Sequence, residues 1–267
     1  MKLNLIAGIF VTVLAGSASL AFAGLVTYSP GTGVSTSPHN MNLYLPLATG
    51  GANTGDNQKQ VCKFCHTPHN TVSTGQASYS PLWNHTQTTQ NFLPYVGIED
   101  GDYMTEPDYL TQSASLQAVI DPADMMDGPS RLCMSCHDGT VAIDSYSGKM
   151  GSFTPTSKNI VLAPDGPLGG SFGGASGGNL MDDHPIGFSY KNVAAQDPYI
   201  HKPTDNISWV PAGDRKCTTI SELLYKGDKM TCASCHDVHN TANKTAAAPL
   251  LRVKLDGSKL CLTCHDK

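Results

Sequence analysis

Residues 62–66 read Cys-Lys-Phe-Cys-His, and the same C-x-x-C-H pattern returns at residues 133–137, 232–236 and 261–265. Two cysteines three positions apart can bond both vinyl groups of one porphyrin, and the histidine that follows then lies under the iron. A chain of this composition would contain the pattern about 0.01 times by chance. The four motifs therefore predict four covalently bound haem c groups.

The attachment residues follow directly from these motifs. Each cysteine pair is expected to form two thioether bonds to one haem, and each motif histidine is expected to be the proximal ligand of its iron. The expected thioether cysteines are Cys62, Cys65, Cys133, Cys136, Cys232, Cys235, Cys261 and Cys264. The expected proximal ligands are His66, His137, His236 and His265.

Two other chemistries use paired cysteines. Four C-x-x-C pairs could form two zinc sites of four thiolates each, and a secreted chain could use its cysteines as a disulfide framework. Neither gives a role to the histidine that follows every pair, so both are disfavoured. Cys217 is the ninth cysteine and lies outside the motifs. It fits either an intermolecular disulfide or an unpaired thiol without function, and the second is favoured.

Six further histidines can supply the second, distal ligands of four irons. Two histidine ligands give a low-potential iron centre suited to electron transfer, while a methionine ligand raises the potential. The expected distal ligands are His39, His69, His85, His184 and His239. His201 is followed by Lys202 and is disfavoured, and a methionine at one haem stays open because nine methionines are present.

Local context supports these distal ligands. His69 and His239 each follow a proximal histidine by three residues, so neither reaches its own iron and each is expected to serve another haem. His85 follows the apolar and aromatic segment at residues 81–84, which would bury its ring beside a porphyrin. His184 follows two aspartates, and these could accept the ring N–H and fix the tautomer.

The composition predicts a loop-rich fold. Glycine and proline number 26 and 17 among 267 residues, and charged residues make up 15%. Such a chain has little aliphatic material for a core, so the haems should fill the interior. We expect a mostly irregular chain with short helices and few short strands, organised around a chain of packed haems. Helices are expected at each motif and at residues 113–119 and 220–225, and strands at residues 160–162 and 188–190.

The N-terminus has the features of a secretory signal peptide. Lys2 precedes an apolar run at residues 5–14, and residues 21–23 (Ala-Phe-Ala) are typical of a cleavage site, so residues 1–23 are expected to be removed. No later stretch has the length of a membrane span. We expect a protein secreted to the extracellular space or cell surface, with the periplasm as the alternative.

The motifs also form a repeat. The first and third motifs continue to a second His-Asn pair, whereas a leucine precedes and an aspartate follows the second and fourth. This alternation indicates a doubled two-haem unit. We expect a first two-haem unit at residues 24–150, a glycine-rich connecting region with candidate distal histidines at residues 151–215, and a second two-haem unit at residues 216–267.

Taken in order, several strings resemble one family. They are CKFCHTPHN (62–70), PLWNH (81–85), SRLCMSCHDGT (130–140), DHPIGF (183–188), CASCHDVHN (232–240) and LCLTCH (260–265). The set resembles the extracellular multihaem cytochromes of metal-reducing bacteria, and the haem count is similar to that of the tetrahaem, filament-forming OmcE-like members. This resemblance implies two histidine ligands for every iron, stacked haems, and subunits joined head to tail, with one distal histidine from the neighbouring subunit.

Electron transfer is therefore the expected function, as a subunit of an extracellular cytochrome filament in anaerobic, metal-reducing respiration. The alternatives are a soluble periplasmic electron shuttle and a donor subunit of a multihaem reductase. An enzyme is not expected, because all four motifs end in histidine and distal histidines are plentiful.

The expected partners are further copies of the chain in a head-to-tail polymer, and other redox proteins or extracellular electron acceptors. His69 is expected to ligate a haem of the neighbouring subunit, with His39, near the mature N-terminus, as the alternative donor. The net charge of −5 and the lack of a basic stretch argue against nucleic acid.

Overall fold

The structure is a computed structural model. It describes residues 29, 31–43, 60–69, 71, 81–92, 95, 98–99, 102–103, 125–151, 180, 183–207, 217–241 and 250–266. All four C-x-x-C-H motifs and all ten histidines lie in these ranges.

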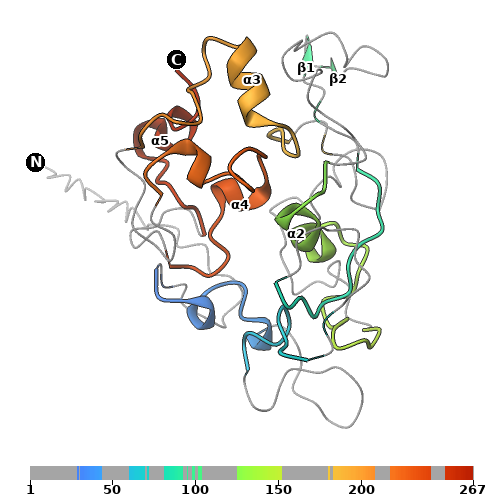
Figure 1. Cartoon of the computed structure of the whole chain (residues 1–267). Coiled ribbons are helices and arrows are strands. Elements are labelled where there is room, and N and C mark those ends of the chain that lie inside the picture. Colours follow the sequence, from blue (N-terminus) through green and yellow to red (C-terminus); the bar gives the residue numbers. More distant parts are fainter. Residues whose placement is uncertain are drawn as a thin grey trace, which may run out of the picture.

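Regular secondary structure is sparse in this part of the chain (Figure 1). The α-helices are α2 (Pro129–His137), α3 (Tyr190–Gln196), α4 (Cys232–Cys235) and α5 (Lys259–Leu262). The 3-10 helices are η1 (Val34–Thr36), η2 (Met41–Leu43), η4 (Ile220–Glu222) and η5 (Asp256–Ser258). One antiparallel pair joins β1 (Ile98–Glu99) to β2 (Asp102–Tyr103). The prediction of a mostly irregular chain with short helices is confirmed.

The prediction of a strand at residues 188–190 is wrong. Helix α3 begins at Tyr190, and the Ser189 hydroxyl accepts a hydrogen bond from the Asn192 backbone N–H. Serine is favoured at this position because its oxygen satisfies one of the free N–H groups of the first turn. Extended pairing consists of isolated bridge positions at Phe188 and Ser189, and Ser189 pairs with Lys229.

At residues 220–225, where a helix is predicted, the structure has the single 3-10 turn η4 at the start of the range. The Glu222 side chain folds back and accepts the Thr219 backbone N–H at 3.2 Å, which forms a capping box. The helix predicted at residues 113–119 and the strand predicted at residues 160–162 lie outside the described residues.

Three small apolar clusters form among the described residues, and each includes or touches a haem motif. The largest packs η4 against α3 and consists of Phe188, Tyr190, Val193, Ile207, Cys217, Ile220, Leu223, Leu224 and Met230, with Cys264 packed against it. The second consists of Phe92, Met125, Met126, Met134 and Leu180. The third consists of Phe64, Ile143 and Tyr146. The apolar side chains therefore support the motifs locally.

The second and third motifs lie side by side because α2 packs against α4 (Figure 1). The Ser130 hydroxyl accepts the Cys232 backbone N–H at 3.2 Å. Gly128, directly before α2, has φ +74°, and a Cβ atom there would lie 2.7 Å from the ring of Tyr225. Glycine permits both this backbone conformation and the close approach. The two halves of the chain thus meet at their haem motifs.

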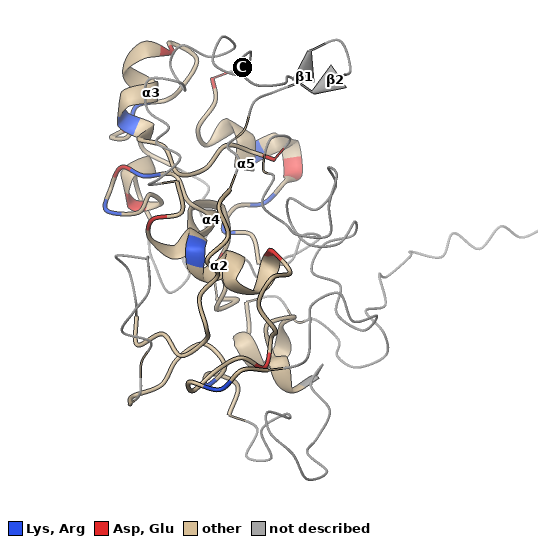
Figure 2. Cartoon of the chain, turned by 90° about the vertical axis from the view of Figure 1, so that its right-hand side faces the viewer, with Lys and Arg blue, Asp and Glu red and all other residues tan. Residues whose placement is uncertain are grey.

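The charged residues are sparse, and Figure 2 shows basic and acidic positions interspersed along the described ribbon. None of the described helices has the length and apolar character needed to cross a membrane.

Candidate haem-binding sites

All four motifs contain the same backbone turn. In three of them the histidine N–H donates to the carbonyl of the first cysteine, at 2.8 Å for His66, 3.0 Å for His236 and 2.9 Å for His265. The remaining motif, which ends at His137, lies within α2. One helical turn places residues i, i+3 and i+4 on the same side. The two thiols and the imidazole of each motif therefore share one face, as attachment to a single porphyrin requires.

Most of the motif thiols are buried in a way that favours the protonated form. Burial raises the pKa of Cys65, Cys136 and Cys235 to about 12 each, because a thiolate is poorly solvated away from water. Zinc binding and disulfide exchange both require the thiolate. None of the nine cysteines is in a disulfide, and the described residues contain no cluster of three or more potential ligands that could hold a metal ion. The raised pKa values disfavour both alternatives at Cys65, Cys136 and Cys235.

Consecutive motifs approach one another through their cysteines. The closest contact joins the second and third motifs, where the Cys133 thiol donates a hydrogen bond to Cys232 and lowers the pKa of Cys232. The other two junctions are close enough for one sulfur to raise the pKa of the next, and they pair Cys65 with Cys136 and Cys235 with Cys264. The four attachment sites therefore follow one another through space in the order of the sequence.

Three motif histidines each face a second histidine across a similar gap. The pairs and their ring-centroid separations are His39–His137 at 6.0 Å, His66–His239 at 6.3 Å, and His184–His265 at 6.4 Å. Two metal–imidazole bonds of about 2 Å each, extended by the radius of both rings, place the centroids about 6 Å apart across a shared metal. These donor sets fit the two axial ligands of a haem iron.

The pair of His39 and His137 is deeply buried. Burial lowers the pKa of both rings, to about 4 for His137, so both imidazoles are neutral at pH 7 and can offer a lone pair to a metal. Nδ1 of each ring has no hydrogen-bond partner in the structure. Buried polar atoms without a partner are rare in proteins and mark places that another group completes.

Backbone carbonyls orient two other rings. His66 Nδ1 lies 2.7 Å from the Pro81 carbonyl, and His184 Nδ1 lies 3.0 Å from the Pro185 carbonyl. Donation from Nδ1 fixes the tautomer and leaves the Nε2 lone pair for a metal. At His184 the Pro185 carbonyl can take this role.

His236 is the motif histidine that faces no second histidine among the described residues. Burial lowers its pKa, and the nearby positive charge of Arg252 lowers it further, so this ring is also neutral at pH 7. His69, a predicted distal ligand, is exposed and likewise faces no described histidine. One motif histidine, His236, and two predicted distal ligands, His69 and His85, are therefore in none of the three pairs.

His85 lies beside the second motif rather than opposite a motif histidine. Its ring nitrogens contact the carbonyls of Thr86 at 2.8 Å and Ala142 at 3.1 Å, and Nε2 is also 3.5 Å from the Cys136 sulfur. Only 2% of the residue is exposed. Its contacts are those of a packed core histidine.

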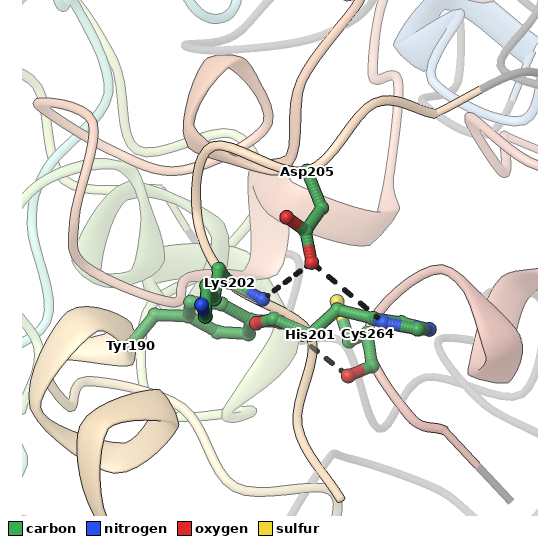
Figure 3. Close-up of polar contacts among 5 residues, drawn as sticks. All are labelled: Tyr190, His201, Lys202, Asp205 and Cys264. Atoms are coloured by element: carbon green, nitrogen blue, oxygen red, sulfur yellow. Dashed lines mark hydrogen bonds and ion pairs between the residues drawn. The ribbon is translucent and has the colours of Figure 1, made fainter. Parts of the chain in front are cut away.

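His201 belongs to a polar cluster beside the fourth motif (Figure 3). Its backbone N–H donates to the Cys264 carbonyl at 2.9 Å, and its Nδ1 lies 3.9 Å from the Asp205 carboxylate. Asp205 also accepts the Lys202 backbone N–H at 2.9 Å. The Tyr190 hydroxyl donates to the carbonyls of His201 at 2.9 Å and Cys264 at 3.4 Å. The cluster thus ties the fourth motif to α3.

Cys217 lies in the largest apolar cluster with 6% of its surface exposed, and its sulfur is 3.5 Å from the Glu222 carbonyl. A buried thiol is not accessible to a second chain. This burial disfavours an intermolecular disulfide at Cys217.

Sequence reasoning missed two buried residues beside the third motif. The Arg252 Nε donates to the Ala233 carbonyl at 2.8 Å, and Asn240 is 2% exposed. Nothing in the sequence connects Arg252 with the motif. Asn240 does carry a signal, because it directly follows the second histidine of the third motif, as Asn70 does in the first.

A comparison with protein families gives one match. Residues 225–267 match the doubled CXXCH motif, and this range contains the third and fourth motifs. No match is found among curated proteins or solved structures. Because C-x-x-C-H is the attachment site of haem c, the paired motifs indicate a multihaem c-type cytochrome that binds haem c covalently and transfers electrons.

Proposed function

We propose that this chain binds four haems and conducts electrons along them in the order of the motifs, as an electron carrier and not an enzyme. The observation that carries the proposal is the series of cysteine neighbours that leads from the first motif to the fourth. The contact between Cys133 and Cys232 brings two thioether edges together in the middle of this series. Porphyrins attached at these cysteines lie next to one another, with no protein core between them.

Two histidine ligands for every iron are part of the proposal. The three facing pairs supply three irons, and we assign His69 to the iron above His236. The first and third motifs have the same local pattern, and His239 of the third faces His66 of the first. If the two motifs exchange ligands in both directions, His69 beside the first motif ligates the haem iron of the third motif. Irons with two histidines have no open position for a substrate, which supports an electron carrier.

Intact-mass spectrometry tests the haem number. The mature protein is expected to have the mass of the chain from Gly24 with four haems attached through eight thioether bonds. A mass with fewer haems, or with zinc, contradicts the proposal. The same measurement tests the signal peptide, since retention of residues 1–23 changes the chain mass.

We further propose export to the cell surface and assembly into a head-to-tail filament that passes electrons to extracellular acceptors in anaerobic respiration. The signal-peptide features of residues 1–23 and the ordered resemblance to extracellular multihaem cytochromes support this step. A soluble periplasmic shuttle or donor subunit is the second candidate, because three of the four histidine pairs form within one chain. Electron microscopy of native material separates the two, as monomers contradict the filament.

The source of the His69 ligand can be tested by dilution. In the sequence-based prediction His69 serves a neighbouring subunit, so dilution of the wild type should produce one high-spin haem per chain. Reciprocal exchange within one chain predicts low-spin haems at every concentration. In either case His69→Ala should leave one iron of four without its second ligand at any concentration. An entirely low-spin spectrum of His69→Ala removes His69 from the ligand set.

A further inference from the structure

The loop of the third motif holds the N-terminal segment that carries His39. Residue 29 and residues 31–40, named the arm here, lie against residues 236–241, and Figure 1 shows the arm in blue next to the orange-red chain that follows α4. The two segments are far apart in the sequence, and the residue that joins them is the buried Asn240.

Asn240 binds the arm through four hydrogen bonds. Its Oδ1 accepts the Gly31 N–H at 3.0 Å, and its Nδ2 donates to the carbonyls of Ser29 at 2.9 Å and Gly33 at 3.0 Å. Its own carbonyl accepts the Gly33 N–H at 3.0 Å. The backbone of Asn240 is left-handed, with φ +56°, a conformation that asparagine tolerates better than most residues. Both polar atoms of this side chain are therefore used to hold the arm.

A short, hydrogen-bonded path leads from this anchor to His39. Helix η1 follows Gly33, and Ser37 comes directly after it. The Ser37 hydroxyl donates to the Val34 carbonyl at 2.9 Å and accepts the His39 backbone N–H at 3.1 Å. Ser37 is 1% exposed. The backbone of Val238, in the same loop as Asn240, lies close enough to the His39 ring to affect its pKa. The position of the His39 ring is thus set by its attachment to residues 236–241.

We propose that Asn240 is a positioning residue for the haem of the second motif. It fixes the arm so that His39 stays opposite His137, at the 6.0 Å separation of their ring centroids. The third motif thereby controls the iron ligation of the second. This inference rests on the proposed ligation by His39 and His137, and it adds a residue from the loop that follows a different motif.

Asn240→Gly removes the side chain alone, because glycine adopts φ +56° without strain. Loss of three hydrogen bonds should weaken the attachment of the arm on the order of a hundred-fold. We expect a protein that keeps four haems by mass but shows a high-spin fraction at one of them in absorption and electron paramagnetic resonance spectra. Added imidazole should restore the low-spin spectrum. Asn240→Asp keeps Oδ1 but places a carboxylate oxygen against the carbonyls of Ser29 and Gly33, so it should also produce a high-spin fraction.

Two controls separate this inference from the ligand assignment. His39→Gly should give one fully high-spin haem, which imidazole also converts to low spin. Thr241→Val changes a residue of the same loop that bonds Asp237, and it should stay low-spin. If His39→Gly remains low-spin, the ligand pair itself is wrong. If His39→Gly is high-spin while Asn240→Gly and Asn240→Asp are both low-spin, only the positioning role of Asn240 is overturned.

Discussion

The sequence predicts both His85 and His184 to be distal haem ligands. Their surroundings in the structure distinguish them. The His184 ring faces His265 with its Nδ1 held by a carbonyl, whereas both nitrogens of His85 are engaged by carbonyls beside Cys136. A neutral imidazole has one N–H, so His85 can donate to only one of these carbonyls, and no motif histidine faces its other nitrogen in the three ring pairs. The two residues should therefore respond differently to the same substitution.

We expect His184→Ala to create one high-spin haem at the fourth motif and to shift its reduction potential. We expect His85→Ala to keep four low-spin haems but to lower the free energy of unfolding by about 2 kcal/mol, because it leaves a cavity and unpaired carbonyls. Magnetic circular dichroism and chemical denaturation measure the two effects. A high-spin haem in His85→Ala would restore His85 to the ligand set, and an unchanged His184→Ala spectrum would remove His184.

At the level of elements, the helical turns at the motifs could be predicted because the spacing of cysteines and histidine itself specifies one turn. The strand at residues 188–190 could not be distinguished from a helix start, since Phe188 and Tyr190 alternate with a polar residue that turns out to be the N-cap of α3. Partners of distal histidines such as His39 depend on contacts between distant segments, which local patterns do not encode. Sequence reasoning therefore offers candidate donors but not their pairing.

The contact of α2 with the second half of the chain depends on Gly128. Gly128→Ala should lower the free energy of unfolding by about 3 kcal/mol, because the new methyl group overlaps the Tyr225 ring and strains a left-handed backbone. Gly148→Ala is the matched control. It has φ +70° with nothing within 4 Å of the added atom, so only the backbone strain of about 1 kcal/mol remains. Equal losses in the two variants would show that the Tyr225 contact contributes nothing.

At the scale of the whole molecule, the described apolar residues form three separate clusters. Small, separated clusters bury little area and do not offset the conformational entropy of a long irregular chain. Chain produced without haem attachment should therefore be disordered by circular dichroism and exchange its amide hydrogens rapidly. The haem-loaded protein is the control and should melt cooperatively. A cooperative melt of the haem-free chain contradicts a haem-organised core.

The contact of Cys133 with Cys232 also has a consequence for biogenesis. In the folded arrangement these two cysteines are in hydrogen-bond contact and the pKa of Cys232 is lowered, so a chain that reaches this arrangement before both haems are attached brings two thiols together. A thiolate beside a thiol is readily oxidised to a disulfide in an oxidising compartment. Such a crosslink would consume one cysteine from each of two attachment sites at once. Maturation of the central haems is thus a kinetic competition between haem attachment and disulfide formation at this junction.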